Sequence, residues 1–281
     1  MTNSLPTEQA EIEPLLRVEA LSRIYLSGGR WSKRAPVAAV SDATFQIQAG
    51  QTHALVGPSG CGKSTVARCV ARLERPDSGR IWLHQQEIAT LRGRELLPIR
   101  TNIQLIFQDA VTSLNPRFSA AEAIEEPLRI QGCDRSERRR NAELVMREVA
   151  LSPCWLDRPI LHFSGGQRQR LAIARALTTR PKLLILDEAF TGLDLSTQAQ
   201  VANLLLELQS AHGLSYLLIS HDLALVASMA DTVAVMAKGN IVENRPTQEL
   251  ISNPQHEETK RLIASTRAAE LGLALKARAS V

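Results

Sequence analysis

The chain has 281 residues, of which 44% are apolar and 22% charged, and its formal net charge is +4. This length allows one large α/β domain with a small extension or two modest domains, and the composition is that of a folded globular protein. No run of roughly 18 apolar residues predicts a membrane-spanning helix, and the polar N-terminus lacks the pattern of a secretory signal. We therefore expect a protein that is made and kept in the cytosol.

Charge and cysteine usage argue against two further classes of protein. The basic residues form no stripe with interleaved aromatic side chains, so we expect no nucleic-acid partner. The cysteines show neither a CxxC spacing nor a paired framework, which indicates a reducing compartment and no metal site. There are four of them: Cys61, Cys69, Cys133 and Cys154.

The first part of the chain predicts strands and then a helix. Residues 16–25 and 37–48 alternate apolar and polar side chains, as half-buried antiparallel strands do. Residues 52–56 form a short apolar strand that runs into a glycine-rich turn, and a helical pattern follows from about 62 to 73.

Strands and helices then alternate. Four later segments are short and apolar: 103–108, 183–187, 216–220 and 232–236. The last three match parallel strands buried on both faces. Helical stretches lie between them at about 196–210 and 223–229. This alternation predicts an α/β fold with a parallel sheet covered by helices on both faces.

The segment between these strands has a different pattern. It predicts two helices, near 120–130 and 136–150, which we interpret as a helical subdomain inserted at about 109–165. We expect a polar tail over 1–14, the main domain over 15–252 and a C-terminal helical tail over 253–281.

The strongest motif follows the strand at 52–56. Glycines in the pattern GxxxxGK[ST] let backbone N–H groups surround phosphate oxygens, and the following helix presents its positive end to them. Lys63 would reach the β- and γ-phosphates, and the Ser64 hydroxyl would ligate Mg²⁺. A chance match in a chain of this length is on the order of 1%. The motif consists of Gly57, Pro58, Ser59, Gly60, Cys61, Gly62, Lys63, Ser64 and Thr65.

Two acidic residues end the apolar segment 183–187. Alone, Asp187 and Glu188 are a weak signal, because many strands end in acids. Ligands of open α/β sheets lie at the carboxyl ends of strands, however, which is where these two residues fall. Asp187 can hold Mg²⁺, usually through water, and Glu188 can accept a proton from an attacking water.

A second glycine motif precedes a helix that runs to about residue 177. Ser164 is a natural N-cap, and the glycines after it leave backbone N–H groups open. Both an ordinary capped helix and a second phosphate-binding helix end fit this pattern. The motif is Ser164, Gly165, Gly166 and Gln167.

Taken in order, these motifs resemble those of the ATP-binding subunits of ABC transporters. The resemblance covers about residues 15–250, and the SGGQ motif is highly specific to that family. It adds Gln108, the sequence Thr191-Gly192-Leu193-Asp194 and the sequence Ser220-His221-Asp222. It implies a P-loop α/β core with an N-terminal antiparallel β-subdomain and an inserted helical subdomain. It also implies ATP and Mg²⁺ as cofactors and ATP hydrolysis as the activity.

The resemblance assigns roles that the residues alone leave open. Gln108 would sense Mg²⁺ and the attacking water, and His221 would contact the γ-phosphate. Asp194 would communicate between two ATP sites, and Tyr25 would stack on adenine. Taken singly, the same residues also fit a strand-end polar residue, a loop histidine, a helix N-cap and a core aromatic.

Two departures from the family pattern stand near these motifs. Phe163 occupies the place where the family usually has leucine, which is a tolerable apolar exchange. Ala189-Phe190 replaces the commoner Pro-Thr after Glu188, and we expect no loss of chemistry from it.

Two further segments resemble oligopeptide, dipeptide and nickel importers. They are Ser113-Leu114-Asn115-Pro116-Arg117 and the tail from Asn253 to Lys260. Many such subunits continue into a cysteine-bearing extension that holds an iron–sulfur cluster. No cysteine follows Cys154 here, so we expect no such cluster. The short tail more closely resembles that of the second ATPase subunit of nickel or dipeptide systems.

We therefore expect an ATPase subunit of an importer for peptides or for nickel and other metal chelates. Its partners would be two integral-membrane permease subunits and a companion ATPase, with a substrate-binding protein acting indirectly. It would work peripherally at the cytoplasmic face of the inner membrane, with the SGGQ motif of one chain facing the phosphate loop of another. The alternative is a soluble ABC ATPase of a multienzyme complex, such as a phosphonate-lyase accessory protein.

Overall fold

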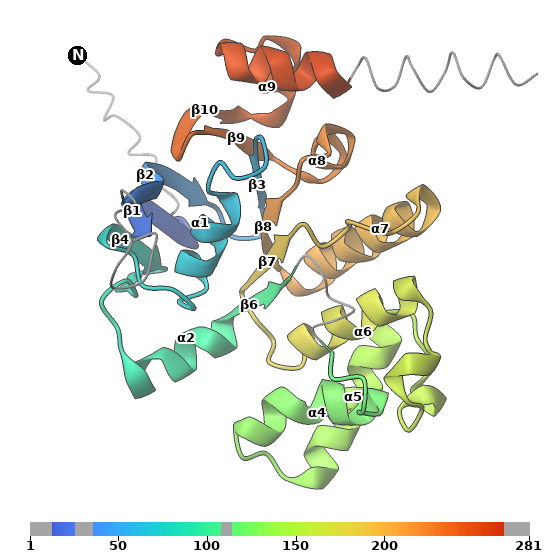
Figure 1. Cartoon of the computed structure of the whole chain (residues 1–281). Helices are drawn as coiled ribbons and strands as arrows, with labels where there is room; N and C mark the ends of the chain where they lie inside the picture. Colours follow the sequence, from blue (N-terminus) through green and yellow to red (C-terminus); the bar gives the residue numbers. More distant parts are fainter. Residues whose placement is uncertain (1–12, 26–35, 108–113, 267–281) are drawn as a thin grey trace, which may run out of the picture.

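A computed structural model describes residues 13–25, 36–107 and 114–266, and within them the chain forms two β-sheets (Figure 1). The smaller sheet is antiparallel and has the order β2-β1-β4-β5. Its strands are β1 (Leu16–Tyr25), β2 (Val37–Ile47), β4 (Ser78–Leu83) and β5 (Gln86–Glu87).

The larger sheet has six strands in the order β10-β9-β3-β8-β7-β6. All its neighbouring strands run parallel except the edge pair of β9 and β10, which is antiparallel. Its strands are β3 (Thr52–Val56), β6 (Ile103–Ile106), β7 (Leu183–Asp187), β8 (Ser215–Ile219), β9 (Thr232–Ala237) and β10 (Asn240–Pro246). Every residue of β3, β7 and β8 is buried, which is why most of their side chains are apolar and do not alternate with polar ones.

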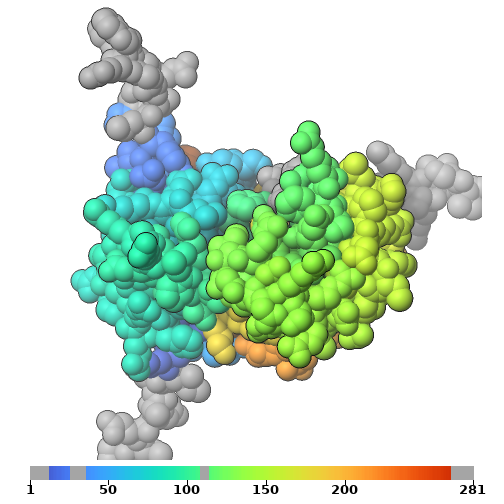
Figure 2. All heavy atoms as spheres, turned by 90° about the horizontal axis from the view of Figure 1, so that it is seen from below, coloured from blue at the N-terminus to red at the C-terminus, as the bar shows by residue number. Residues whose placement is uncertain are grey.

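Eight α-helices with described bounds surround the larger sheet. They are α1 (Lys63–Val70), α2 (Leu96–Asn102), α4 (Ala120–Ile130), α5 (Arg135–Glu148), α6 (Gly165–Leu177), α7 (Leu195–His212), α8 (Leu223–Met229) and α9 (Thr247–Ser252). Helices α4, α5 and α6 pack together as a group away from the antiparallel sheet (Figure 1). In the space-filling view the green residues of α4 and α5 form a lobe beside the teal segment that contains α2 (Figure 2).

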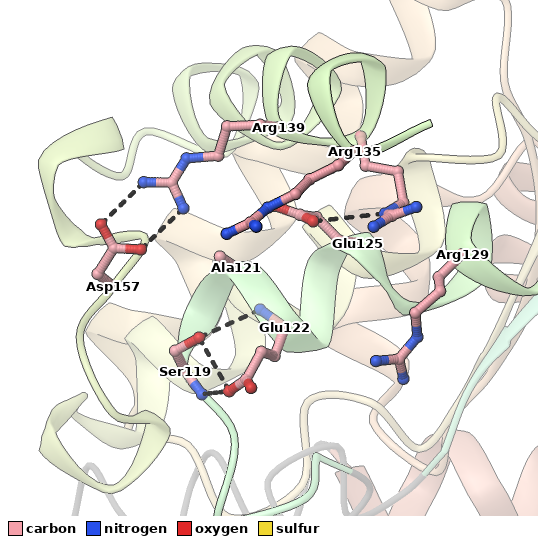
Figure 3. Close-up of a pocket in the computed structure, with 9 residues that line it drawn as sticks. Ser119, Ala121, Glu122, Glu125, Arg129, Arg135, Arg139 and Asp157 are labelled. Atoms are coloured by element: carbon pink, nitrogen blue, oxygen red, sulfur yellow. Dashed lines mark hydrogen bonds and ion pairs between the residues drawn. The ribbon is translucent and has the colours of Figure 1, made fainter. Parts of the chain in front are cut away.

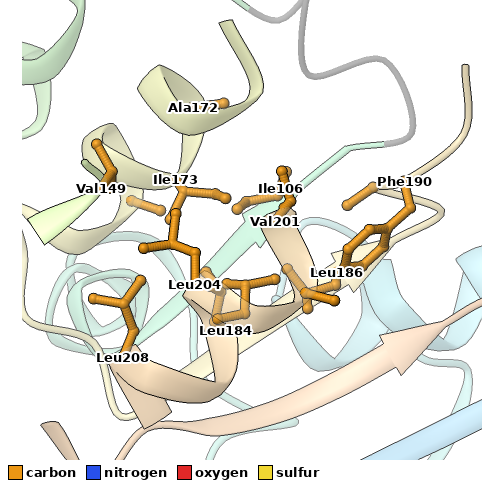
Figure 4. Close-up of a cluster of buried hydrophobic side chains, with 14 of the residues drawn as sticks. Ile106, Val149, Ala172, Ile173, Leu184, Leu186, Phe190, Val201, Leu204 and Leu208 are labelled. Carbon is orange, nitrogen blue, oxygen red and sulfur yellow. The ribbon is translucent and has the colours of Figure 1, made fainter. Parts of the chain in front are cut away.

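The larger sheet packs against a separate apolar cluster on each face, because successive side chains of its buried strands point to opposite faces. On β7, Leu183 and Ile185 contact the apolar cluster that includes α1 and the antiparallel sheet. Leu184 and Leu186 point the opposite way, into the cluster formed with α4 to α8 (Figure 4). Successive side chains of a strand point to opposite faces, so a fully apolar strand fills both layers. The phosphate-loop motif, which follows β3, therefore lies at the end of a strand that is fixed on both faces.

The predicted α/β class with an antiparallel subdomain and helices between the strands is confirmed. The segments 16–25, 52–56, 120–130, 183–187 and 223–229 have the predicted bounds, and the bounds of the other predicted elements differ by one to three residues. The sequence patterns did not predict β4, β5, β10, α2 or α9. The limits of the inserted subdomain and of the two tails stay predictions, although residues 257–266 of the expected C-terminal helix are helical.

None of the helices in the described parts of the chain is long and apolar enough to cross a membrane.

Candidate nucleotide-binding site

The loop after β3 is closely packed, and two of its glycines have a clear steric reason. Gly57 has φ +149°, and a Cβ there would lie 2.2 Å from the carbonyl oxygen of Met236. Gly62 has φ +112°, and a Cβ there would lie 2.2 Å from the carbonyl oxygen of Ala39. Any side chain at either position would require the backbone to move. The glycines therefore allow backbone carbonyls of β9 and β2 to pack directly against the loop and fix its conformation.

Lys63 begins α1 and turns its side chain back over the loop. Its ammonium donates to the carbonyl oxygens of Gly57 at 2.8 Å and Pro58 at 3.1 Å, and the residue is 5% exposed. The N-cap of α1 is Gly62, which has no side chain to bond the first helical N–H groups. A buried cation and open N–H groups at a helix N-terminus together favour an anion.

The loop borders a hollow of about 310 Å³. Besides loop residues, its lining includes Glu188 from the end of β7 and Ala39 from β2. Ala39 was missed by the sequence analysis, because nothing in a strand alanine signals that its backbone will lie against a loop more than twenty positions away. The full lining is Ala39, Ser59, Gly60, Gly62, Lys63, Ser64, Thr65 and Glu188.

Ser64 and Asp187 meet across the same region. The Ser64 hydroxyl donates to an Asp187 carboxylate oxygen at 2.9 Å. Burial raises the pKa of Asp187 above its usual range, and the Ser64 hydroxyl, Arg68 and Lys63 act in the opposite direction. A buried carboxylate that is short of positive charge, beside a hydroxyl oxygen, suits a hard cation such as Mg²⁺.

Ser64 and Asp187 by themselves supply too few ligands to enclose a metal ion. Among the described residues, no group of three or more His, Cys, Asp or Glu side chains is placed to hold an ion. A magnesium ion at Ser64 and Asp187 would therefore take other ligands from water and nucleotide phosphates, as this ion commonly does. The two residues fit such an ion, and Gln108, the third predicted ligand, lies outside the described residues.

Glu188 and His221 lie together at the ends of neighbouring strands. Glu188 follows β7 and His221 follows β8 by two residues. The Nδ1 atom of His221 is 3.8 Å from a carboxylate oxygen of Glu188, and the histidine side chain is 62% exposed against 17% for the glutamate. The pairing of β7 with β8 brings them together, so the carboxylate that borders the phosphate hollow has an imidazole beside it.

The second glycine motif begins α6 as a capping box. The Ser164 side chain accepts from the Gln167 N–H at 3.3 Å, and the Gln167 side chain accepts from the Ser164 N–H at 3.0 Å. Gly165 and Gly166 make up the first turn of the helix. None of these four residues lines the hollow at the phosphate loop. The fold thus places the two glycine motifs apart within one chain.

Asp194 and Tyr25 both form side-chain hydrogen bonds within the chain. Asp194 caps α7, accepting from the Thr197 N–H at 3.0 Å and from the Thr197 hydroxyl at 2.6 Å. The Tyr25 hydroxyl donates to Glu74 at 2.5 Å, and the Arg23 guanidinium lies 5.0 Å from the centre of the tyrosine ring. A base stacked on Tyr25 would therefore use the face of the ring opposite Arg23.

Cys61 is buried in the phosphate loop and does not line the hollow. It is 5% exposed and belongs to the apolar cluster below the loop. Its sulfur lies 3.8 Å from the Lys63 ammonium. This placement favours the interpretation of Cys61 as a small apolar filler.

A phosphate loop at the end of a buried parallel strand, with a carboxylate at the end of a strand in the same sheet, defines a P-loop nucleotide-binding protein. The family model described as ABC transporter matches residues 40–191. The chain belongs to the ABC transporter family, and it is an ATP-binding and ATP-hydrolysing member of that family.

Several curated relatives are similar over most of the chain. A probable peptide ABC transporter ATP-binding protein of Sinorhizobium fredii is 46% identical over 90% of this chain and 72% of its own. The di/tripeptide transport ATP-binding protein DppF of Pseudomonas aeruginosa is 41% identical over 91% of this chain and 80% of its own. The glutathione import ATP-binding protein GsiA of Pectobacterium atrosepticum is 42% identical over 94% of this chain, which spans only 43% of that longer protein.

Solved structures agree with the fold. A dimeric ATP-binding cassette in a post-hydrolysis state, bound to ADP and Pi, is 25% identical and superposes with a TM-score of 0.73 over 83% of this chain and 98% of its own. A CbiO1 protein of Clostridium perfringens, part of the CbiONQ transporter complex, is 26% identical with a TM-score of 0.75 over 94% of this chain and 99% of its own.

Proposed function

We propose that this chain is the ATPase subunit that drives an importer of short peptides. The observation that carries the proposal is the similarity, at 41–46% identity over about nine-tenths of the chain, to proteins named for peptide transport. The named relatives support peptides over nickel as cargo. They also support a transporter over a soluble multienzyme complex, because each is named as a transport or import protein.

The site supports a division of labour among its residues in hydrolysis. Lys63 and the open N–H groups of α1 would bind the phosphates, because both are fixed at the hollow before ATP arrives. Ser64 and Asp187 would hold Mg²⁺, which neutralises phosphate charge. Glu188 would accept the proton of the attacking water, and His221 beside it would contact the γ-phosphate. Gln108 would complete the metal and water site.

The SGGQ motif would act on ATP bound to another chain. Within one chain Ser164 to Gln167 do not line the phosphate hollow, so their open helix end is left for a nucleotide from outside. The dimeric cassette among the similar structures supports this arrangement. The second chain would be a copy of this one or a companion ATPase, with Asp194 near the contact between the two sites.

The membrane partners would be two permease subunits, with the ATPase bound peripherally at the cytoplasmic face of the inner membrane. Large exposed apolar side chains favour a protein partner at α2 and α4, where Leu97 is 54% and Ile130 74% exposed. The two helices are bridged by a hydrogen bond from the Gln131 side chain to the Thr101 hydroxyl at 3.4 Å.

Capture from solubilised membranes tests the importer proposal. Tagged chain should bring down a pair of multi-spanning permease proteins, and the reconstituted complex with its binding protein should take up labelled dipeptide only with ATP. Recovery of a soluble assembly without permease would favour the alternative. Uptake of Ni²⁺ instead of dipeptide would overturn the peptide assignment.

A pair of N-cap variants tests the composite ATP site. Asp caps a helix about as well as Ser, so Ser164→Asp should keep α6 folded while placing a negative charge where the γ-phosphate of the other chain would lie. ATP turnover at saturating MgATP should fall by about 10-fold or more, since a like charge there costs over 1.4 kcal/mol in a desolvated site.

A control variant on α4 and a mixture of two variant chains complete this test. Ser119→Asp changes the same kind of cap on α4 and should leave turnover near the wild-type rate. Mixing Ser164→Asp with Lys63→Ala chains should restore activity that neither has alone, because one of the two sites is then intact. A mixture that stays inactive, with wild-type activity strictly proportional to concentration, would contradict a site shared between chains.

A further inference from the structure

The segment that leads into the SGGQ motif carries an arginine that lies beside two aromatic rings. The guanidinium carbon of Arg158 lies 4.9 Å from the centre of the Phe163 ring and 5.6 Å from that of Trp155. The two rings meet edge to face, with centres 6.1 Å apart and planes at 73°. Arg158 also donates through Nη2 to the His162 carbonyl oxygen. One side chain thus joins Trp155 to the residues that immediately precede Ser164.

The main chain of the same segment is anchored to the helical group. The Arg158 carbonyl accepts from the Ala120 N–H at 3.0 Å, at the start of α4, and the Arg158 N–H donates to the Trp155 carbonyl at 3.0 Å. The preceding residue, Asp157, makes two hydrogen bonds with Arg139 of α5, at 2.8 and 2.9 Å (Figure 3). The base of the segment is therefore fixed to α4 and α5, and Arg158 is the side-chain link from that base to the end at Phe163.

The contact also gives a role to the aromatic residue that directly precedes the motif. Phe163 is 3% exposed. Leucine would fill much of the same space but would present no aromatic face to a cation. The guanidinium is planar, stacks on rings and donates in a fixed fork, which an ammonium group cannot do. Arg158 and the phenylalanine are therefore matched to each other.

We propose that Arg158 is a positioning residue, which through Phe163 and the His162 carbonyl fixes the start of α6 so that Ser164 and Gly166 meet the ATP of the other chain. The proposal rests on the composite site proposed above. Arg158 touches no part of the phosphate hollow. Its effect should accordingly appear in the rate of the closed, two-chain state and not in the binding of ATP to the phosphate loop.

Arg158→Gln is the first test, because glutamine keeps part of the stem and removes the cation. A cation–π contact at a partly desolvated site corresponds to roughly a 5- to 30-fold effect on an equilibrium. Amide hydrogen exchange over residues 159–168 should accelerate by about that factor, and maximal turnover should fall by about the same factor. ATP affinity and exchange at α1 should stay within about twofold of wild type. Arg158→Lys should recover part of the turnover, because it keeps the charge but not the plane.

The Arg158→Gln, Phe163→Leu double variant tests whether Arg158 acts through the Phe163 ring. If Arg158 acts partly through the ring, Arg158→Gln should cause a clearly smaller loss in the Phe163→Leu background than in wild type, as coupled contacts do. Only the contacts to Trp155 and to the His162 carbonyl are then left to remove. A full additional loss in that background would overturn the proposal. Arg140→Gln is the matched control, since Arg140 is exposed on α5 and has no side-chain hydrogen bond or ion pair among the described residues.

Two other results would also overturn it. Wild-type exchange and turnover in Arg158→Gln would show that the start of α6 needs no such link. A parallel fall in turnover, ATP affinity and melting temperature would show general destabilisation in place of positioning. If Ser164→Asp proves harmless, the composite site fails, but the exchange measurement still decides whether Arg158 holds the start of α6.

Discussion

Glu188 is a residue whose backbone and side chain are both set by contacts at the end of β7. Its φ of +50° lies in the left-handed region, which costs a non-glycine residue roughly 1–2 kcal/mol. The conformation is held because the Glu188 N–H donates to the Ile219 carbonyl at 3.0 Å and its carbonyl accepts from Thr191 at 3.1 Å. The turn directs the carboxylate to the phosphate hollow, within 3.8 Å of His221. Strain of this kind often accompanies a functional side chain.

Replacing Glu188 by glutamine tests its proposed role as the base. Glutamine has the same shape but cannot accept a proton from water, so Glu188→Gln should lower maximal turnover by about 10²- to 10⁴-fold. ATP should still bind, because Lys63, Ser64 and Asp187 are unchanged. Phosphate release at saturating MgATP measures the first effect, and nucleotide binding to the isolated chain measures the second.

Glu258→Gln provides a matched control on the C-terminal helix, where Glu258 pairs only with Arg261 among its ion-pair partners in the described residues. It should hydrolyse ATP at the wild-type rate. Turnover of Glu188→Gln close to wild type would remove Glu188 from the role of base.

The beginnings of α6 and α7 are packed against each other, which links two of the predicted motifs. A Cβ on Gly166 would lie 2.6 Å from Cγ2 of Thr197, whereas a Cβ on Gly165 would meet nothing within 4 Å. Thr197 cannot turn away freely, because its hydroxyl and its N–H both bond Asp194. The second glycine of the motif is therefore required by packing within the chain, whatever it contacts on ATP.

Alanine at the two positions should have opposite effects on stability. Gly165→Ala should raise stability by up to about 1 kcal/mol, the difference in helix propensity. Gly166→Ala should lower it, because displacing Thr197 weakens the Asp194 cap, which contributes about 1 kcal/mol. Urea unfolding of the isolated chain compares the two.

A second substitution, on α7, tests whether the contact with Thr197 is what destabilises Gly166→Ala. Thr197→Ser removes Cγ2 and keeps the hydroxyl that bonds Asp194, so the Gly166→Ala, Thr197→Ser double variant should regain most of the lost stability. If the double variant stays as unstable as Gly166→Ala, the contact with Thr197 is not the reason for the glycine.

At the scale of the whole molecule, His53 joins the two sheets. It lies on β3, stacks on Phe45 of β2 with ring centres 5.0 Å apart, and its Nδ1 is 2.8 Å from the Thr232 hydroxyl of β9. Its Nε2 is buried without a hydrogen-bond partner among the described residues. Burial lowers the pKa of His53 from 6.5 to about 4. The folded chain therefore keeps this imidazole neutral in the seam between its two layers.

Acid should weaken the fold through this histidine. Above pH 6.5 the group is neutral in both states and its full contribution is present. Between pH 6.5 and about 4 the unfolded chain binds a proton that the folded chain does not, so stability falls by about 3 kcal/mol. Urea unfolding at pH 7.5 and pH 4.5 should show a smaller loss for His53→Gln than for wild type, because glutamine does not titrate.

The exposed His162 supplies the comparison, since His162→Gln removes a histidine side chain at the surface. Its loss of stability on acidification should equal that of wild type. An equal loss in His53→Gln would assign the acid sensitivity to other groups.

The motifs could be predicted from the sequence because each is contiguous and determines its own local geometry. The glycines at 57 and 62, Lys63 and the capping pair Ser164 and Gln167 have the conformations that their residue types favour. The apolar runs at 183–187 and 216–220 similarly indicated strands buried on both faces, and they correspond to β7 and β8. Family, fold class and the order of the site motifs followed from these local patterns.

Contacts between distant segments were decided only by the tertiary structure. Three such contacts depend on how strands and helices pack: the Ala39 carbonyl against Gly62, Thr197 against Gly166, and Arg158 against Trp155 and Phe163. So does the burial of His53, whose sequence context is that of an ordinary strand. A residue type and its sequence neighbours determine which local conformations are low in energy. Which side chain a residue contacts across the core depends instead on the path of the whole chain.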